Sequence, residues 1–272
     1  MTQGPYAWGA QREPRRRHNP SSGATNCYAA PLMCGRYTIR NPRRVLAGFS
    51  ILEKAPALEP RFNVAPSQGV WAIRKPSAAA RPLLDLLRWG LAGKPAPKSP
   101  AVVMIRAEGL GKRPPFVDAL RRRRCLLVAD GFYEWRRAGQ KSFPYYFARP
   151  DGAPFAIAAI WEEASSQGSP LDACALITRP ALAPVDSVHH RMPVLLAAAH
   201  RERWLDPTFE DVPTLSQMLV DPPEFTLQAR PVSSRVNSPA HDDEACTDPI
   251  EETEQHGEQF ELWPAREERG GA

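Results

Sequence analysis

Thirty proline residues are spread along this chain of 272 residues, and they limit its secondary structure to short pieces. Proline has no backbone N–H and its ring clashes inside a helix, so a helix or central strand rarely continues through one. The spacing therefore argues against a helical bundle. Because 43% of the residues are apolar, the short pieces can still bury a sizeable core. We expect an α+β fold, a single domain of bent, mainly antiparallel strands that form a barrel-like core with short peripheral helices.

Apolar and β-branched runs between turn residues predict the individual elements. Strands are expected at residues 35–39, 70–74, 83–89, 125–129, 132–136, 145–148, 155–161, 173–178 and 225–232. Helices are expected at 42–49, 115–123 and 200–205, the first opened by Asn41 as N-cap and Pro42 as first helical residue. The pair Asp130-Gly131 predicts a hairpin turn, and residues 61–68 predict a loop.

Composition divides the chain into three parts. Residues 1–32 contain glycine, proline, serine and a basic run but no apolar core of a secretory signal. We expect a misassigned start or a disordered leader there; a propeptide removed later and a transit peptide are the alternatives. Residues 33–237 would form the folded domain. Residues 238–272 would form an acidic, disordered tail.

The formal charge of +5 hides an asymmetry between the domain and its tail. Residues 238–272 hold eleven acidic residues against two arginines, a net charge of −9, so residues 1–237 carry +14. The leader holds four arginines and one glutamate, which leaves +11 on residues 33–237. A domain this basic attracts polyanions, and nucleic acid is the commonest of these. A surface with scattered lysine and arginine is the plainer interpretation.

The five cysteines are an odd number without metal-ligand spacing, which favours a reducing, cytoplasmic setting over a disulfide framework. No apolar run is long enough to span a membrane. The sequence also lacks a glycine-rich phosphate loop and zinc-type cysteine and histidine pairs. We therefore expect no metal and no nucleotide cofactor. A monomer is the default expectation.

A start-like pentapeptide, Met33-Cys34-Gly35-Arg36-Tyr37, lies inside the chain. If synthesis began at Met33, removal of that methionine would leave Cys34 as the first residue. Its α-amine, with a reference pKa of about 7.7–8.0, would be partly neutral and nucleophilic near pH 7. The amine can condense with an aldehyde to an imine, and the thiol can then close a five-membered thiazolidine. Cys34 would thus trap aldehydes.

Three further islands accompany this pentapeptide: Arg106-Ala107-Glu108, the run from Ala129 to Trp135, and the run from His189 to Val194. With them, from Met33 to about Pro249, the sequence resembles the SOS-response-associated peptidase (SRAP) family of abasic-site processing proteins. The resemblance implies a DNA-damage protein that binds single-stranded DNA and captures abasic sites covalently through its N-terminal cysteine. It makes residues 33–237 the catalytic and DNA-binding domain, in the cytoplasm and nucleoid-associated when bound to DNA.

The resemblance also assigns roles to individual residues. Cys34 would be the nucleophile, Glu134 the acid and base group, and His189 the proton donor to the sugar ring oxygen. By residue type alone, Cys34 could be a buried hydrophobe, Glu134 a solvated carboxylate and His189 a structural histidine. The neighbouring His190 differs from His189 only in its register within the island.

DNA contacts are expected from four side chains. Arg36, Arg106 and Arg191 are candidate phosphate ligands, because a guanidinium binds phosphate through two parallel hydrogen bonds; ordinary ion pairing is the alternative. Trp89 could stack on an unpaired base, or it could be a core residue that follows Leu86 and Leu87. The family usually has asparagine where this chain has Met104, so an active-site amide is missing and capture could be slower.

Two other functions stay open. A cysteine autopeptidase could use Cys34, Glu134 and His189 to cut after Met33, since such residue sets serve acyl transfer. A noncatalytic barrel could bind single-stranded nucleic acid without covalent chemistry. In the leading reading, an imine stage could also permit β-elimination and hence a minor lyase activity.

Overall fold

The computed structural model describes residues 35–49, 56–91, 100–112, 114–164 and 171–251. Cys34 and residues 1–33 and 252–272 lie outside this described part of the chain. All elements below belong to the unit Met33–Ala272.

The described elements are mostly short strands. They are β1 (Arg36–Ile39), β2 (Arg61–Val64), β3 (Gly69–Arg74), β4 (Leu83–Trp89), β5 (Met104–Arg106), β6 (Arg124–Ala129), β7 (Gly131–Ala138), β8 (Lys141–Ala148), β9 (Phe155–Glu162), β10 (Ala173–Pro180), β11 (Arg191–Pro193) and β12 (Gln228–Pro231). The α-helices are α1 (Pro42–Ala47), α2 (Ala107–Leu110), α3 (Pro114–Arg122), α4 (Arg201–Leu205) and α5 (Val212–Met218). Short 3-10 helices are η1 (Val185–Ser187), η2 (Ala198–His200), η3 (Ser234–Asn237) and η4 (Glu244–Cys246).

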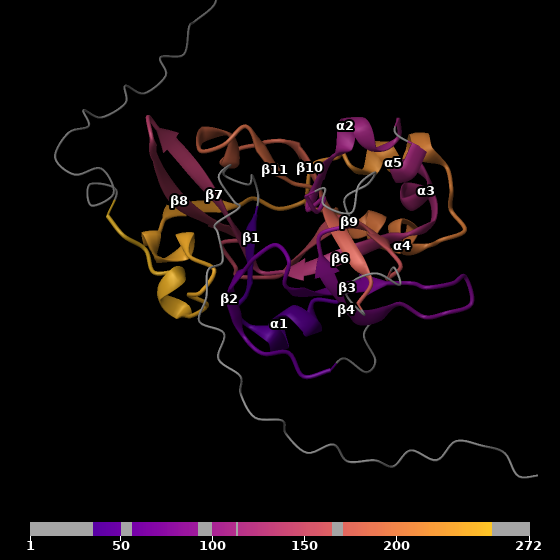
Figure 1. The fold of residues 1–272 in the computed structure, drawn as a ribbon, viewed down its shortest axis with the longest axis horizontal. Helices are drawn as coiled ribbons and strands as arrows, with labels where there is room; N and C mark the ends of the chain where they lie inside the picture. Colours follow the sequence, from indigo (N-terminus) through magenta and orange to yellow (C-terminus); the bar gives the residue numbers. More distant parts are fainter. Residues whose placement is uncertain (1–34, 50–55, 92–99, 113, 165–170, 252–272) are drawn as a thin grey trace, which may run out of the picture. The chain divides into compact units, whose positions relative to one another are not determined.

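Two sheets organise the described strands. The first has the order β12-β8-β7-β1-β2, and all its pairs are antiparallel. The second runs β11-β10-β4-β3-β6-β9, and β9 also pairs with β10, so that five of its strands close into a ring. Figure 1 shows α1 near β2, and α2 to α5 beside the second sheet. The expected α+β fold with mainly antiparallel strands is confirmed.

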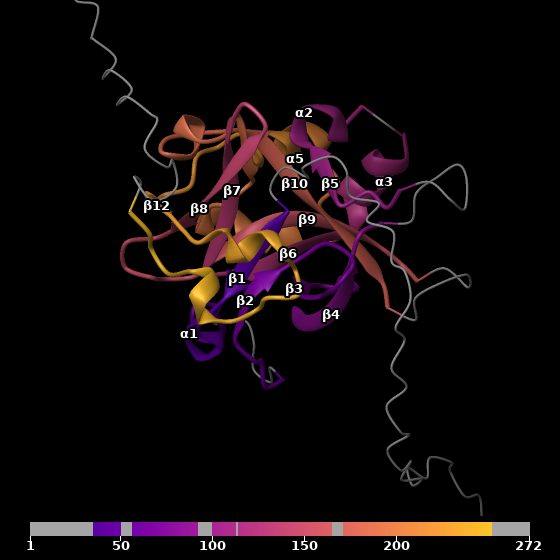
Figure 2. The ribbon, with the colours of Figure 1, turned by 60° about the vertical axis from the view of Figure 1, so that its left-hand side comes forward.

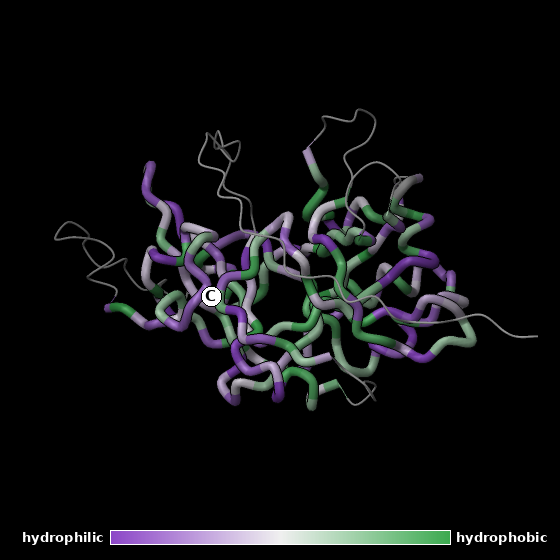
Figure 3. The backbone as a smooth tube through the Cα atoms, turned by 60° about the horizontal axis from the view of Figure 1, so that its bottom comes forward, coloured by the Kyte–Doolittle hydropathy of each residue, from purple (hydrophilic) through white to green (hydrophobic). Residues whose placement is uncertain are grey.

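The core follows from the apolar strands of the ring. Every residue of β6 is buried, and β9 is buried over seven of its eight residues. Both strands have neighbours on each side within the closed sheet, so neither presents an open edge. In Figure 3 the hydrophobic stretches, coloured green, gather in the middle of the view, while hydrophilic stretches lie mostly at its margin.

The prediction of a hairpin turn at Asp130-Gly131 is wrong, because the strands on either side, β6 and β7, belong to different sheets. Asp130 is 2% exposed, and its carboxylate accepts hydrogen bonds from the backbone N–H groups of Arg40 and Asn41 and from the Thr38 hydroxyl. These bonds attach the bend to the end of β1, so β7 pairs with β1 instead of returning along β6. Gly131 is required there because an added Cβ would lie 2.1 Å from the ring of Tyr146.

Other differences from the expected elements are local. The predicted loop at 61–68 begins with strand β2, and β8 starts at Lys141, earlier than expected. The short elements β5, β11 and α5 were not predicted. Asn41 caps α1 as expected, its side chain accepting the Arg44 N–H at 3.0 Å. Among the described helices, none is long and apolar enough to cross a bilayer.

The acidic segment expected to be a disordered tail is folded over its first part. Residues 238–251 are described, and they include η4 with the buried Cys246, followed by the buried Thr247. The remaining residues of that segment, 252–272, lie outside the described part.

Candidate active site

Glu134 and His189, 55 positions apart in sequence, lie together. Glu134 comes from β7, and His189 from the turn before β11. His189 Nδ1 is 3.6 Å from Glu134 Oε2, and the two side chains are 15% and 1% exposed. Removing a carboxylate from water is costly unless polar partners surround it. A buried carboxylate beside an imidazole is therefore a place where a proton can be exchanged.

The strand β7 explains why Glu134 is buried. It lies between β8 and β1, and its residues Phe132, Tyr133 and Glu134 are all buried. Tyr133 belongs to an apolar cluster on one face with Tyr146 and Val232. Because side chains alternate along a strand, Glu134 points to the opposite face from Tyr133. That is the side from which His189 approaches.

The backbone of Arg191 orients the His189 ring. The Arg191 N–H donates to His189 Nδ1 at 3.1 Å, which requires a lone pair on that nitrogen. With this bond formed, the neutral ring carries its proton on Nε2; the other neutral tautomer would instead donate from Nδ1 to the Arg191 carbonyl at 3.0 Å. In the imidazolium form Nδ1 would instead donate, and the Arg191 carbonyl at 3.0 Å or Glu134 would accept. Protonation of His189 thus changes which group it bonds.

Burial lowers the pKa of His189 below its usual value, and the charges of His190, Arg137 and Arg191 lower it further. The hydrogen bond to the Arg191 carbonyl acts in the opposite direction. The rings of His189 and His190 are 4.4 Å apart. The neutral form of His189 is therefore favoured at pH 7.

The described chain begins next to this pair. Gly35 is buried and precedes Arg36, whose Cα partner on β7 is Tyr133, the neighbour of Glu134. The predicted nucleophile Cys34 itself lies outside the described residues. Its chain neighbour Gly35 nevertheless enters the fold at the level of Glu134.

Of the three candidate phosphate ligands, Arg36 is engaged inside the fold. Its guanidinium donates to Asn63 Oδ1 at 2.8 Å and to the carbonyls of Val236 and Asn237 at 2.6 and 3.2 Å. These contacts supply hydrogen-bond partners to the Arg36 guanidinium from within the protein, so its position does not require a phosphate. Asn63, which the sequence placed in a loop, is instead a fully buried residue of β2.

Arg191 is likewise engaged. It forms a two-pronged ion pair with Glu108 (2.5 and 3.0 Å), and it donates to the backbone oxygen of Thr178 at 2.8 Å. The Arg191 side chain is 8% exposed, and that of Glu108 is 49% exposed. The hydrogen bonding from Arg191 lowers the pKa of Glu108. The pair joins two of the sequence islands and fixes the backbone that holds His189.

Arg106 differs from these two arginines because it is exposed, at the end of β5. Within the described part of the chain its guanidinium has no hydrogen bond or ion pair, although its charge helps to lower the pKa of Glu108. Arg106 is therefore available to a phosphate. Met104, the residue that departs from the family pattern, lies on the same strand beside Leu176 of β10.

Trp89 lies in the core. It is 0% exposed, its indole N–H donates to the Val103 carbonyl at 2.8 Å, and its ring is 5.6 Å from that of Tyr37. Trp89 is therefore a core residue, as one of the two interpretations predicted, and neither face of its ring is open to a nucleobase.

Sequence reasoning missed two carboxylates near the site. Glu108 was noted only as part of an island, although its position two residues after Arg106 and its match to Arg191 could have suggested an ion pair. Asp242 was assigned to the tail, but it binds β2. Among the described residues, no group of three or more His, Cys, Asp or Glu side chains could hold a metal ion.

Comparisons with known proteins agree with the islands and the fold. The family model "SOS response associated peptidase (SRAP)" matches residues 33–239. Abasic site processing protein YoaM of Bacillus subtilis is 36% identical over 215 residues, which cover 76% of this chain and 94% of YoaM. Abasic site processing protein HMCES of Gallus gallus is 33% identical over 153 residues, 48% of this chain and 45% of HMCES.

Solved structures share the fold. A protein from Bacteroides thetaiotaomicron superposes with a TM-score of 0.64 at 19% identity, covering 80% of this chain and all of that one. A phage-related protein of Bordetella bronchiseptica has a TM-score of 0.60 at 25% identity over 73% of this chain and 94% of its own. From the family match and the YoaM identity together, the chain belongs to the SOS response associated peptidase (SRAP) family.

Proposed function

We propose that this protein recognises abasic sites in single-stranded DNA and captures them covalently through Cys34 as part of the DNA-damage response. The observation that carries the proposal is the buried pair Glu134 and His189, 3.6 Å apart, beside the point where the chain that follows Cys34 enters the fold. The relatives YoaM and HMCES are named as abasic site processing proteins, which supports the substrate.

The chemistry begins after Met33 is removed and the amine of Cys34 is free. The amine adds to the aldehyde carbon of the ring-opened sugar, and loss of water gives an imine. The Cys34 thiol then adds to the imine carbon while the nitrogen takes a proton, which closes a thiazolidine ring. One water is released overall, and nothing is oxidised or reduced.

Two side chains move the protons. Glu134 accepts a proton from the Cys34 ammonium group and returns one to the departing hydroxyl. His189, with its proton on Nε2, donates to the ring oxygen of the closed sugar and favours the open aldehyde. The exposed Arg106 binds a backbone phosphate. At the imine stage, β-elimination of the 3′ phosphate would give a minor lyase activity.

A crosslinking assay on denaturing gels tests the proposal. It compares protein that starts at Cys34, the full 272-residue chain and the Cys34→Ala variant on single-stranded DNA with one abasic site. A shifted band from the Cys34-started protein, and none from Cys34→Ala, is the expected result. Absence of a band from every form would contradict covalent capture and leave a binding protein.

The family name favours a second candidate, thiol autoproteolysis before Cys34. Cys34, Glu134 and His189 are also the residue types that this reaction uses. The intact mass of the purified full chain tests this candidate: self-removal of residues 1–33 that is lost in Glu134→Ala would support autoproteolysis.

We place the protein in the cytoplasm as a monomer, associated with the nucleoid when bound to DNA.

A further inference from the structure

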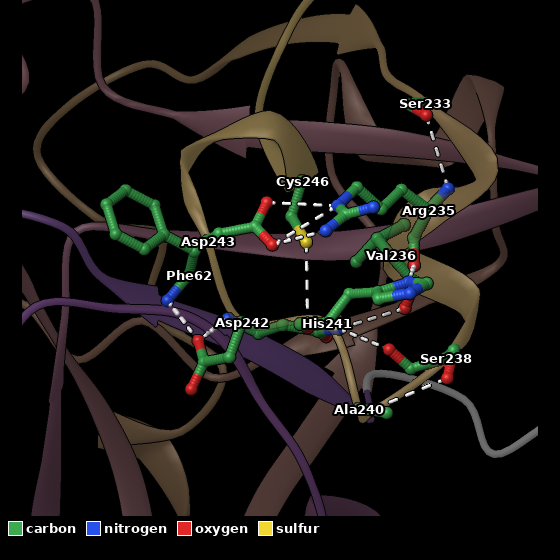
Figure 4. A network of polar contacts seen from close by, with 11 residues as sticks. Phe62, Ser233, Arg235, Val236, Ser238, Ala240, His241, Asp242, Asp243 and Cys246 are labelled. Atoms are coloured by element: carbon green, nitrogen blue, oxygen red, sulfur yellow. Dashed lines mark hydrogen bonds and ion pairs between the residues drawn. The ribbon is translucent and has the colours of Figure 1, made fainter.

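The chain after β12 forms a segment that we name the C-terminal strap, residues 233–250. It leaves β12 at one edge of the first sheet and binds β2 at the other edge. Figure 2 shows this yellow segment in front of β1 and β2, and Figure 4 shows its polar contacts. Sequence composition had assigned most of it to a disordered tail, so its order needs a physical cause.

One cause is the carboxylate of Asp242. Its Oδ1 accepts the backbone N–H groups of Phe62 and Asn63 at 2.6 and 2.8 Å, and its Oδ2 bonds the Arg61 side chain. The side chain of Asp242 is 26% exposed. Hydrogen bonds to a charged acceptor are stronger than neutral ones. Asp242 therefore attaches the strap firmly to β2.

The second cause is Asn63, which is fully buried. Its amide NH2, which has two hydrogens to share, lies within hydrogen-bond distance of three strap carbonyls, those of Val236, Ser238 and His241, at 3.2, 3.0 and 2.7 Å. Its amide oxygen accepts from Arg36 at 2.8 Å. A buried amide left without partners destabilises the fold, so the strap and Asn63 depend on one another.

The strap also contacts the strands that hold the active site. Arg36 of β1 donates to the carbonyls of Val236 and Asn237. On β7, the indole N–H of Trp135, the residue after Glu134, donates to Asn237 Oδ1 at 2.7 Å. The strap therefore binds both the strand that follows Cys34 and the strand that carries Glu134.

We infer that the C-terminal strap positions the nucleophile, and that Asp242, Asn63 and Arg36 are positioning residues for capture. The inference rests on the proposed function, because it assigns these residues to the reaction of Cys34. Asp242 and Asn63 hold the strap, the strap holds Arg36, and Arg36 fixes the start of β1 next to Glu134. Since a misplacement of about 1 Å can slow a reaction by about 100-fold, a loosened strap should slow capture without weakening DNA binding.

The test variant is Asp242→Ala, and its matched control is Asp243→Ala. Both remove one negative charge at adjacent positions, but Asp243 pairs with Arg235 inside the strap at 2.6 Å. The rate of capture is measured in single turnover at saturating DNA, and the dissociation constant in a Cys34→Ala background. Asp242→Ala should slow capture by about 10- to 100-fold with the dissociation constant within about twofold, and Asp243→Ala should match the parent.

Asp242→Asn keeps one oxygen acceptor for the two backbone N–H groups but loses the charged oxygen that bonds Arg61, so an intermediate rate is expected. A parent-like rate for Asp242→Ala, or an equal loss in Asp243→Ala, would overturn the inference. If Asp242→Ala does not fold, Asp242→Asn becomes the test variant, and a parent-like rate for it has the same meaning.

Amide hydrogen exchange separates this inference from the proposed function. Asp242→Ala should speed exchange in β1, at Tyr37 and Thr38, but not in β9, whereas Asp243→Ala should leave both strands unchanged. Unchanged exchange in β1 of Asp242→Ala would refute positioning by the strap. If the parent protein forms no crosslink, covalent capture fails, and the exchange result still decides whether the strap holds β1.

Discussion

At the scale of single residues, the site combines a buried carboxylate with a histidine that is held neutral. The Arg191 backbone contacts His189 Nδ1, while burial and nearby positive charges lower the His189 pKa. Glu134 is 1% exposed and 3.6 Å away. In the proposed capture reaction, this pair would supply one proton donor and one proton acceptor from side chains that are largely shielded from water.

Replacing Glu134 by glutamine should slow capture while the protein stays folded. The amide keeps the shape of the side chain but cannot accept a proton, and a positioned acid or base typically contributes about 10²–10⁴-fold. We expect a loss of at least about 100-fold in the single-turnover crosslinking rate. Glu210→Gln, at an exposed ion pair with Arg122, is the control. A Glu134→Gln rate equal to that of the control would remove Glu134 from the proton path.

His189 should make stability depend on pH. Its pKa is lowered on folding, so the unfolded chain binds more protons than the folded one between the lowered pKa and about 6.5, the unfolded value. The free energy of unfolding therefore falls as the pH drops through this window. Urea unfolding between pH 7.5 and 5 should show this decrease in the parent and a smaller one in His189→Gln. Equal slopes in the two proteins would mean that folding does not shift the His189 pKa.

Trp89 offers a test of core against DNA contact. Trp89→Phe loses the indole hydrogen bond to Val103 and part of a buried ring. It should lower the free energy of unfolding by about 1–3 kcal/mol. Affinity for single-stranded DNA should be retained by the folded variant. A loss of affinity with unchanged stability would instead place the ring at the DNA.

At the scale of elements, an ion pair connects α2 to β11. Arg191 is buried at the start of β11, and Glu108 of α2 is its carboxylate partner. Because His189 is bonded to the backbone of Arg191, the pair supports the histidine through one turn of chain. Loss of Glu108 leaves a buried guanidinium with fewer partners.

Glu108→Gln should therefore cost more stability than an exposed pair does. We expect a decrease of about 1–2 kcal/mol, below the 3–5 kcal/mol of a fully buried pair because Glu108 is 49% exposed. Glu210→Gln again serves as control, and its loss should stay under about 1 kcal/mol. Thermal and urea unfolding of both variants measure the difference. Equal losses would show that the Arg191 pair adds nothing beyond surface electrostatics.

Much of this element structure could be predicted from sequence, because hydrophobic runs and turn residues are local signals. Strands such as β6 and β9 and the cap of α1 followed from them. The switch of β7 into the other sheet did not, since it depends on Asp130 bonding a backbone about 90 residues away. The folded state of the strap could not be predicted for the same reason. The acidic composition around Asp242 predicts a solvated segment, but Asp242 bonds β2 about 180 residues earlier in the chain. The burial of Trp89 and the hydrogen bonds of Arg36 inside the fold likewise depend on tertiary neighbours.

At the scale of the whole molecule, charge separates into a basic domain and an acidic end. Residues 33–237 carry +11, and residues 238–272 carry −9. Part of the acidic charge is used inside the fold, where Asp242 bonds β2 and Asp243 pairs with Arg235. Net charge alone therefore overstates how much of the acidic end can compete with DNA. Free arginines such as Arg106 are better indicators of where phosphates bind.

The salt dependence of DNA binding tests this distinction. Each phosphate contact on single strands contributes about −0.7 to the slope of log K against log salt. In a Cys34→Ala background, which prevents crosslinking, Arg106→Ala should weaken binding and make that slope shallower by about 0.7. Arg235→Ala removes the same charge from an arginine already paired with Asp243, so its slope should match the parent. If both variants change the slope equally, binding responds to net charge, and Arg106 makes no specific phosphate contact.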